Sequence, residues 1–512
     1  MPDNTVNNKR IAKNTLMLYC RMAIMMIVSL YTSRVILRAL GVEDYGVYNI
    51  VGGIVPMFSI LSASLSTAIN RFLTYELGRG DINRLRRVFS TSMTIQALLS
   101  LVIFVLAETI GLWYVNNVMV VPPERLTAAN WCYQFSIITF IINLLSVPYN
   151  SAIISHEKMS LFALIGIFEG LSVLAIALVI SVSSLDRLIL YGALLCLLYV
   201  IIRFFYTFYC TRHFEEVKFN ISWDKEMLHS MLGFAGWNFF GAGSRILRDY
   251  GVNVLLNLFH GPVVNAARGI SNSVNSAISR FSENFIMSVN PQITKSYANK
   301  EDENMFNLIF RSSRFSVFLL LLLSAPILLN TSFVLGIWLT EVPDHTSLFI
   351  KLILIYTITE AISYPLVTAM LATGNIKNYQ LIVGGFQCLN FPLAWIALKI
   401  GLFPESVIVV SIFIAHCCFI SRLIMLRKMI GLDAKAFFYK VYVRVLSVAI
   451  LGFVLPLILR FIIPYGWSNF IIVTICSLCV MSISVLFVGC DKVERKYIYN
   501  LMTSYIKRFR ND

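Results

Sequence analysis

Charge is scarce in this sequence. Only 13% of the 512 residues are Asp, Glu, Lys or Arg, whereas 58% are hydrophobic and the mean hydropathy is +0.75. Soluble domains usually carry about 25% charged residues, and surface area falls too slowly with size for a soluble fold to hide so much apolar surface. A soluble globular fold is therefore excluded, and lipid must be the solvent for most of the chain.

The sequence also lacks the motifs of common catalytic sites. It has no Walker-type phosphate loop, its six histidines form no metal-binding pattern, and nothing resembles a nucleophile–base arrangement. The CxxC of Cys476 and Cys479 lies within an apolar run, where cysteines behave as small hydrophobes. We therefore expect no enzymatic activity, no metal and no cofactor other than a coupling ion, H⁺ or Na⁺.

Long apolar runs are abundant instead, and about 20 such residues cross a bilayer as a helix. The sequence predicts an all-α polytopic membrane protein with fourteen transmembrane helices. They are expected at 15–40, 47–70, 88–115, 129–153, 161–183, 188–210, 231–259, 262–290, 313–337, 346–372, 379–400, 404–426, 437–463 and 467–489. This gives a six-helix lobe (1–210), a cytoplasmic linker (211–230), a second six-helix lobe (231–426) and a C-terminal helix pair with a basic tail (427–512).

The net charge of +15 is concentrated in the connectors between these runs. On one side of the membrane the connectors and tails hold 28 Lys and Arg residues, and on the other side only Arg125 and Arg187. Positive residues mark cytoplasmic loops, so both termini are expected in the cytoplasm. The positive charge therefore indicates membrane topology and anionic lipid, not nucleic acid.

The two six-helix blocks look like copies of one another. Gly41 and Gly261 each occupy the expected outer turn between two helices, and a charged linker follows the next helix from Tyr75 and again from Ser296. The offset is about 220 residues at both places. An even number of helices gives the copies the same orientation, as in transporters built from parallel repeats with substrate bound between the halves.

The segment from Ser33 to Ile54, SRVILRALGVEDYGVYNIVGGI, and the loop RFLTYELGRGD from Arg71 to Asp81 carry a family resemblance. With the six-six-two organisation, they resemble the Wzx-type polysaccharide flippases of the multidrug/oligosaccharidyl-lipid/polysaccharide (MOP) superfamily. Leu40, Gly41, Tyr45 and Gly46 fit that family's Leu-Gly-x-x-x-Tyr-Gly turn. The resemblance implies a MATE-like fold of two lobes and alternating access between them.

It also implies a function. Such proteins move undecaprenyl-pyrophosphate-linked oligosaccharide units across the bacterial inner membrane for O-antigen or capsule synthesis. The implied partners are membrane lipid, the lipid-linked glycan, and the polymerase and glycosyltransferases of the same pathway. A cation-coupled multidrug or metabolite exporter of the same superfamily and a peptidoglycan lipid II flippase are the alternatives. The arginine-aspartate signature of the latter is missing, because Val35 follows Arg34.

Charged residues inside the spans are the candidate site, because each costs at least about 2.5–3.5 kcal/mol to insert. Arginine forks match phosphate oxygens. The candidate substrate-binding cations are Arg34, Arg245, Arg248 and Arg268. Asp249 lies four residues after Arg245, a spacing that allows the two to pair and would leave Arg248 for the substrate. The alternative for Arg245 and Arg248 is a salt bridge within the helix or between the lobes. Asp249, Glu169 and Glu360 are candidates for ion coupling or for partners of these arginines.

Overall fold

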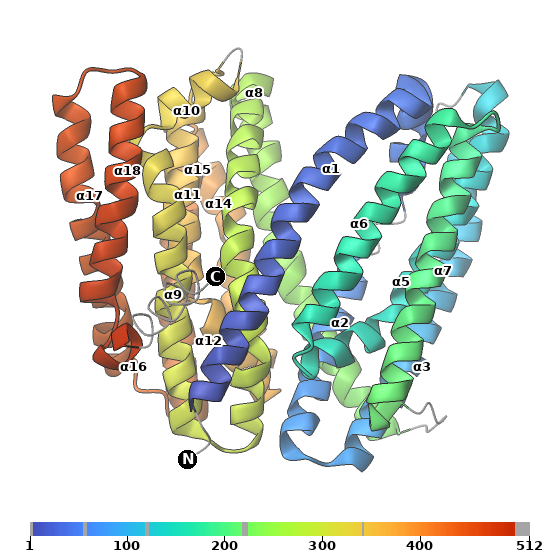
Figure 1. Ribbon diagram of the computed structural model, residues 1–512, viewed down its shortest axis with the longest axis horizontal. Coiled ribbons are helices and arrows are strands. Elements are labelled where there is room, and N and C mark those ends of the chain that lie inside the picture. The colour runs from blue at the N-terminus through green and yellow to red at the C-terminus, as the bar shows by residue number, and fades with distance from the viewer. Residues whose placement is uncertain (1–3, 55–58, 118–121, 218–223, 340–341, 497–512) are drawn as a thin grey trace, which may run out of the picture. The chain divides into compact units, whose positions relative to one another are not determined.

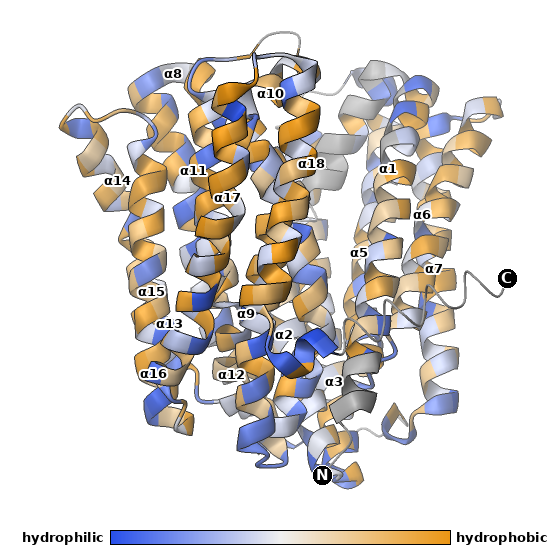
Figure 2. Cartoon of the chain, turned by 60° about the vertical axis from the view of Figure 1, so that its left-hand side comes forward, coloured by the Kyte–Doolittle hydropathy of each residue, from blue (hydrophilic) through white to orange (hydrophobic). Residues whose placement is uncertain are grey.

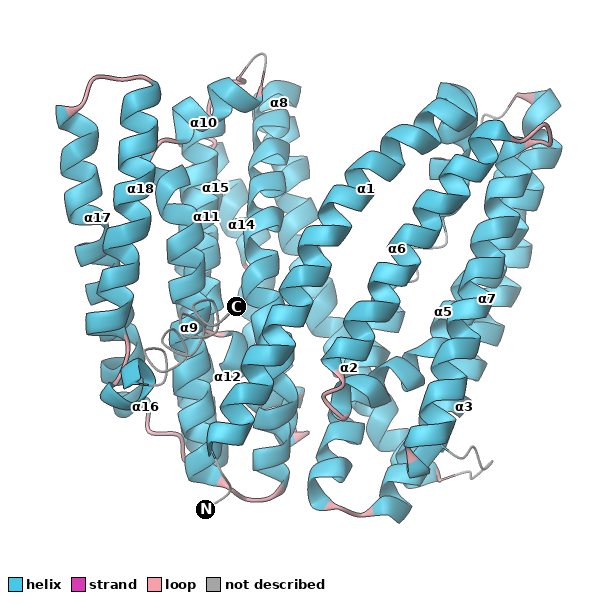
Figure 3. Cartoon of the chain, in the orientation of Figure 1, coloured by secondary structure: helices cyan, strands magenta, loops and turns pink. Residues whose placement is uncertain are grey.

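The computed structural model describes residues 4–54, 59–117, 122–217, 224–339 and 342–496, and within these ranges it contains helices and no strand (Figures 1 and 3). The longer helices are α1 (Asn4–Ile54), α2 (Ser59–Arg79), α3 (Ile82–Leu106), α5 (Leu126–Ser155), α6 (Met159–Val182), α7 (Arg187–His213), α8 (Lys225–Ala298), α9 (Asp302–Leu329), α11 (Thr346–Ala361), α15 (Ser406–Ile430), α17 (Arg444–Ile462) and α18 (Trp467–Ser484). The shorter ones are α4 (Leu112–Asn117), α10 (Thr331–Trp338), α12 (Tyr364–Thr373), α13 (Lys377–Cys388), α14 (Asn390–Lys399) and α16 (Ala434–Phe437).

Eleven helical stretches of the described chain are long and apolar enough to cross a membrane. The three expected spans that are not among them are 47–70, 231–259 and 262–290, which are helical wherever the structure describes them. The chain is thus a multi-pass membrane protein, and the all-helical prediction is confirmed.

The most apolar helices show where lipid is expected. Only 22% of the most apolar stretch of Ala434–Ile462, and of Trp467–Gly489, is buried within the structure. Most of α17 and α18 is hydrophobic along its visible face (Figure 2). Exposed apolar surface on this scale requires an apolar solvent, because in water it would be a large exposed patch.

The predicted helix breaks at Gly41 and Gly261 are confirmed. Gly41 has φ 80° and ψ 170°, and Gly261, 220 positions later, has φ 78° and ψ −172°. Only glycine adopts this backbone region readily. The same unusual conformation at both positions is what a repeated helix–turn–helix unit requires.

The start of the next helix repeats as well. Helix α3 begins after Asp81, whose side chain accepts a hydrogen bond from the Arg84 backbone amide, and helix α9 begins after Glu301. The residues just before these two, Gly80 and Lys300, both have positive φ. Helix boundaries and backbone conformation therefore follow the offset found in the sequence.

The chain folds into two compact units. Unit 1 contains residues 1–242 and 294–300, and unit 2 contains residues 243–293 and 301–512. Within unit 1, helix α6 packs along α1, and α5 packs along α7. Within unit 2, helix α15 packs against α11, α13 and α14, and the pair α17–α18 packs against α9.

Buried ion pairs hold the C-terminal helix pair to α9. Arg314 on α9 has only 3% of its side chain exposed and lies 2.8 Å from Glu494, which also contacts Arg311. Asp491, beyond the end of the last span, pairs with Arg314 and Arg444. Burial raises the pKa of Asp491, but the hydrogen bond from Arg444 and the charge of Arg314 outweigh it and hold that pKa below its usual value.

Candidate functional site

Helix α8 supplies most of the candidate site. Asp224 caps its start by accepting a hydrogen bond from the Met227 backbone amide. Gly261 then divides it into two arms, 225–260 and 262–298. At 1.5 Å per residue each arm is about 50 Å long, which exceeds the thickness of the hydrocarbon core of a bilayer.

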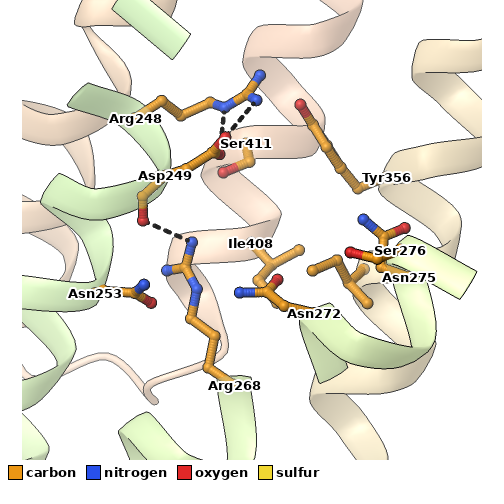
Figure 4. Close-up of a pocket in the computed structure, with 11 residues that line it drawn as sticks. Arg248, Asp249, Asn253, Arg268, Asn272, Asn275, Ser276, Tyr356, Ile408 and Ser411 are labelled. Carbon is orange, nitrogen blue, oxygen red and sulfur yellow. Dashed lines mark hydrogen bonds and ion pairs between the residues drawn. The ribbon is translucent and has the colours of Figure 1, made fainter. Parts of the chain in front are cut away.

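A cavity of about 390 Å³ lies within unit 2 (Figure 4). This volume is typical of small-molecule sites. Both arms of α8 line it, together with α11 and α15. The lining residues are Arg248, Asp249, Asn253, Arg268, Asn272, Asn275, Ser276, Ile353, Tyr356, Ile408 and Ser411.

An apolar core holds the cavity walls in place. Val252, Ala267 and Val407 are fully buried next to the lining residues, one or a few positions along the same helices. They pack with Phe349 of α11 in one cluster. The cavity is therefore bounded by rigid helices.

Arg248 is paired within the cavity. Its Nε and Nη2 atoms lie 2.8 Å and 3.1 Å from the two carboxylate oxygens of Asp249, as a two-pronged ion pair. Its guanidinium also lies 5.5 Å from the centre of the Tyr356 ring, within cation–π range. Asp249 therefore pairs with Arg248 and not with Arg245, so the alternative of a salt bridge within the helix holds for Arg248. Arg245 is exposed and does not line the cavity.

Arg268 is the least satisfied cation of the cavity. It is only 7% exposed, and its Nη2 makes a long hydrogen bond of 3.4 Å to the Asp249 backbone carbonyl (Figure 4). Its Nε and Nη1 atoms are buried and have no hydrogen-bond partner among the described residues. A buried guanidinium is stable only when it is paired, so these two N–H groups indicate a site for an anion.

The cavity combines positive charge with neutral polar groups. Its charged lining residues are two arginines and one aspartate, which leaves one excess positive charge. The other polar lining residues are Asn253, Asn272, Asn275, Ser276, Tyr356 and Ser411. The asparagines were not predicted from the sequence. Their spacing could have identified them, because Arg268, Asn272 and Asn275 recur on one face of the polar span 262–290.

The remaining candidates lie elsewhere. Arg34 on α1 is exposed, and its side chain makes no hydrogen bond or ion pair with any described residue. Glu169 on α6 accepts a hydrogen bond of 2.9 Å from the Tyr199 hydroxyl within unit 1. Neither residue lines the cavity of unit 2.

The side chain of Glu360 lies near Arg422, an arginine that was not among the candidates from the sequence. Its carboxylate lies 4.0 Å from Nη1 of Arg422 on α15, whose side chain is 3% exposed. Glu360 is the next-to-last residue of α11, just before the break that separates α11 from α12. Ion coupling and pairing with one of the candidate arginines were equal alternatives for Glu360. The structure places it beside Arg422, which was not one of those candidates, because α15 packs against α11.

Known proteins with related sequence or structure place the fold. No family model matches the sequence. Membrane protein EpsK of Bacillus subtilis, described as uncharacterized, is 23% identical over 124 residues, which is 24% of this chain and only 24% of that relative. Solved structures match over far more of the chain.

One such structure is an outward-facing multidrug resistance MATE family transporter of the MOP superfamily, with a TM-score of 0.71 and 12% identity over 83% of this chain and 97% of that one. The fold is the MATE fold. A second match, a MOP superfamily transporter from Pyrococcus furiosus Vc1, has a TM-score of 0.68 and 12% identity over 83% of this chain and 96% of that one. It is described as having a binding pocket of reverse polarity that suggests a different function. At such low identity, these likenesses show the MATE fold alone.

Proposed function

We propose that this chain is a flippase that moves undecaprenyl-pyrophosphate-linked oligosaccharide units across the bacterial inner membrane. Transport proceeds by alternating access, both termini lie in the cytoplasm, and the product feeds O-antigen or capsule synthesis outside. The polymerase and glycosyltransferases of that pathway are its functional partners. The fold supports the mechanism, and the chemistry of the cavity supports the substrate.

The buried guanidinium of Arg268 carries the proposal. It presents two N–H groups without a protein partner beside a cavity of about 390 Å³. A pyrophosphate offers several oxygen acceptors and negative charge, and a guanidinium binds such oxygens through paired hydrogen bonds. A lipid-linked pyrophosphate would therefore satisfy the charge that the protein leaves open.

Transport of a defined lipid tests the proposal. Proteoliposomes containing the purified protein and undecaprenyl diphosphate N-acetylglucosamine are assayed for transbilayer movement of that lipid. Each lost charge-assisted hydrogen bond removes about 1.5–3 kcal/mol, so Arg268→Ala is expected to slow transport at least 100-fold. Arg268→Lys keeps the charge but loses the fork, and about a tenfold loss is expected.

Arg280→Ala is the matched control. Arg280 lies on the same arm of α8, is exposed and does not line the cavity. Its replacement is expected to change the rate less than twofold. If the Arg268→Ala variant is correctly folded in the membrane and still transports the lipid at the wild-type rate, the proposal is refuted.

The likeness to a multidrug resistance transporter makes drug export the second candidate function. A cationic drug would meet two arginines and only one aspartate in this cavity, and that aspartate is already engaged by Arg248. Efflux of ethidium from cells expressing the protein, with no movement of the lipid-linked sugar in proteoliposomes, would favour the exporter.

A further inference from the structure

The asparagines of the cavity are placed next to the anion site. Asn272 follows Arg268 by one helical turn on the second arm of α8, about 6 Å along the axis. Asn253 follows Asp249 by one turn on the first arm. Both side chains line the cavity and both are half-buried (Figure 4).

These two carboxamides are available to a ligand. Neither Asn253 nor Asn272 makes a hydrogen bond with another residue of the described chain. Asn275 differs, because its side-chain oxygen accepts a hydrogen bond from the hydroxyl of Thr357. Two carboxamides of the cavity, one on each arm of α8, are thus open, in addition to the N–H groups of Arg268.

A carboxamide carries both a donor and an acceptor and therefore complements a hydroxyl, which is also both. Adjacent hydroxyls on a ring offer such groups at several positions. The side chains of Ile353 and Ile408 add apolar surface to the same cavity, which suits the C–H faces of a sugar ring.

We infer that the cavity in unit 2 binds a hexopyranose ring that bears an anionic group, with Arg268 on the anion and Asn253 and Asn272 on the ring hydroxyls. The inference rests on the proposed function and extends it from the lipid pyrophosphate to the sugar attached to it. Two sources supply the same chemistry: a phosphate at the anomeric carbon or a carboxylate on the ring. In both cases the distance between the anion and the ring hydroxyls is similar to the spacing of Arg268 and Asn272, which are one helical turn apart.

Binding of two lipids to purified protein tests the amide contacts. The probes are undecaprenyl diphosphate and undecaprenyl diphosphate N-acetylglucosamine. Wild-type protein is expected to bind the sugar-bearing lipid at least tenfold more tightly. Asn253→Leu and Asn272→Leu each remove neutral hydrogen bonds, so each is expected to weaken that binding about fivefold and to leave the bare diphosphate lipid unaffected.

The bare lipid also reports on folding, because its unchanged affinity shows that a variant retains its cavity. Asn272→Ala repeats the test with a smaller side chain. Asn257→Leu is the matched control, since Asn257 is on the same arm as Asn253 but is exposed and outside the cavity. It is expected to bind both lipids as the wild type does.

Two failures are distinguishable. If Arg268→Ala weakens the binding of both lipids while the asparagine variants weaken the binding of neither, the sugar site is refuted and the flippase proposal stands. If Arg268→Ala changes neither affinity, the proposed function is refuted and the sugar site with it.

Soluble competitors identify the source of the anion. Glucose 1-phosphate, methyl glucuronide and neutral methyl glucoside are compared as inhibitors of binding of the sugar-bearing lipid. If glucose 1-phosphate inhibits more strongly than the other two compounds, and this advantage is lost in Arg268→Ala, the anion is assigned to the phosphate. The same pattern for methyl glucuronide assigns it to a ring carboxylate, and inhibition by all three to the same extent would contradict the anionic site.

Discussion

The two units share one scaffold but differ in the polar groups they place inside it. Arg268 of unit 2 corresponds, at the repeat offset, to Tyr48 of unit 1, and Arg248 corresponds to Val28. Tyr48 packs edge-to-face against Tyr191, with ring centres 4.9 Å apart. The position occupied in unit 2 by an arginine with unpaired N–H groups is thus occupied in unit 1 by a tyrosine that packs against another aromatic ring.

Two deep polar groups of unit 1, Glu169 and Arg203, have local partners. Tyr199 donates to Glu169, and Arg203 donates to the Leu145 carbonyl while lying 4.2 Å from the centre of the Tyr149 ring. In unit 2, Arg268 keeps two buried N–H groups open beside a cavity. The difference teaches that the repeat sets the helices and their turns, whereas the residues proposed to bind the substrate are ones that the repeat does not share.

The largest expected contrast between the units concerns their acidic residues. Glu360→Gln removes the negative charge beside Arg422, and loss of one partner from a buried pair costs about 3–5 kcal/mol. Glu169→Gln keeps an oxygen that accepts the hydrogen bond from Tyr199, so a loss below about 1 kcal/mol is expected. Thermal unfolding in detergent measures both. Equal destabilisation would contradict the assignment of Arg422 as the partner of Glu360.

The same two variants test ion coupling. Proton-dependent transport of the lipid-linked sugar in proteoliposomes is expected to lose its pH gradient dependence in the variant whose carboxylate carries the proton. Unchanged dependence in both would remove Glu169 and Glu360 from the coupling role.

A smaller, symmetric effect is expected at the repeated turns. Gly41→Ala and Gly261→Ala force alanine into a backbone region that costs about 1–3 kcal/mol, although a Cβ at either position meets no atom within 4 Å. Both variants are expected to lower the unfolding temperature by similar amounts. Gly243→Ala is the control, because a Cβ there also meets nothing and its φ is not in the left-handed range. An effect at only one of the two turns would break the equivalence of the units.

The smallest expected effect depends on pH. Burial raises the pKa of Asp186, but hydrogen bonds from Arg125 and from backbone amides outweigh it and hold the pKa below its usual value. A lowered folded pKa stabilises the protein above the unfolded value of about 3.9, and this contribution disappears as pH falls through the folded pKa. Asp186→Asn is therefore expected to lower the unfolding temperature slightly at pH 7 and to match the wild type only once the pH falls below the folded pKa of Asp186.

Unit 2 holds a different pair in this region: His345 is at the position equivalent to Arg125, and its side chain lies 2.6 Å from that of Glu405, one residue before the position equivalent to Asp186. Unfolding of Glu405→Gln in the same pH series shows whether the His345–Glu405 pair has the same pH dependence as the Arg125–Asp186 pair. A difference between Asp186→Asn and wild type that stays constant down to pH 3 would contradict the role of the ionised carboxylate.

Much of the architecture was predictable because it depends on local properties of the chain. Runs of apolar residues fixed the helices, and Gly41 and Gly261 marked turns because few other residues tolerate their backbone conformation. The internal offset predicted where α3 and α9 begin. The spans 231–259 and 262–290 were also predicted as helices, but their apolar pattern did not show that both line one cavity.

The candidate site was predictable only in part. Arg248, Arg268 and Asp249 were expected from their charge within apolar spans, and all three line the cavity. Their pairing was not predictable from spacing alone, since Asp249 has arginines both four residues and one residue before it. Arg422 and Tyr356 lie far from α8 in the sequence, so no local pattern connects them to it.

By itself, the sequence determined that this is a helical membrane protein, that its halves repeat, and that arginines lie within the spans. These follow from the cost of placing polar groups in lipid and from the backbone freedom of glycine. Only the tertiary structure decided which arginine keeps its N–H groups open, because pairing depends on which helices pack together. Arg268 is open because Arg248 already occupies the carboxylate of Asp249 and leaves it only a backbone carbonyl.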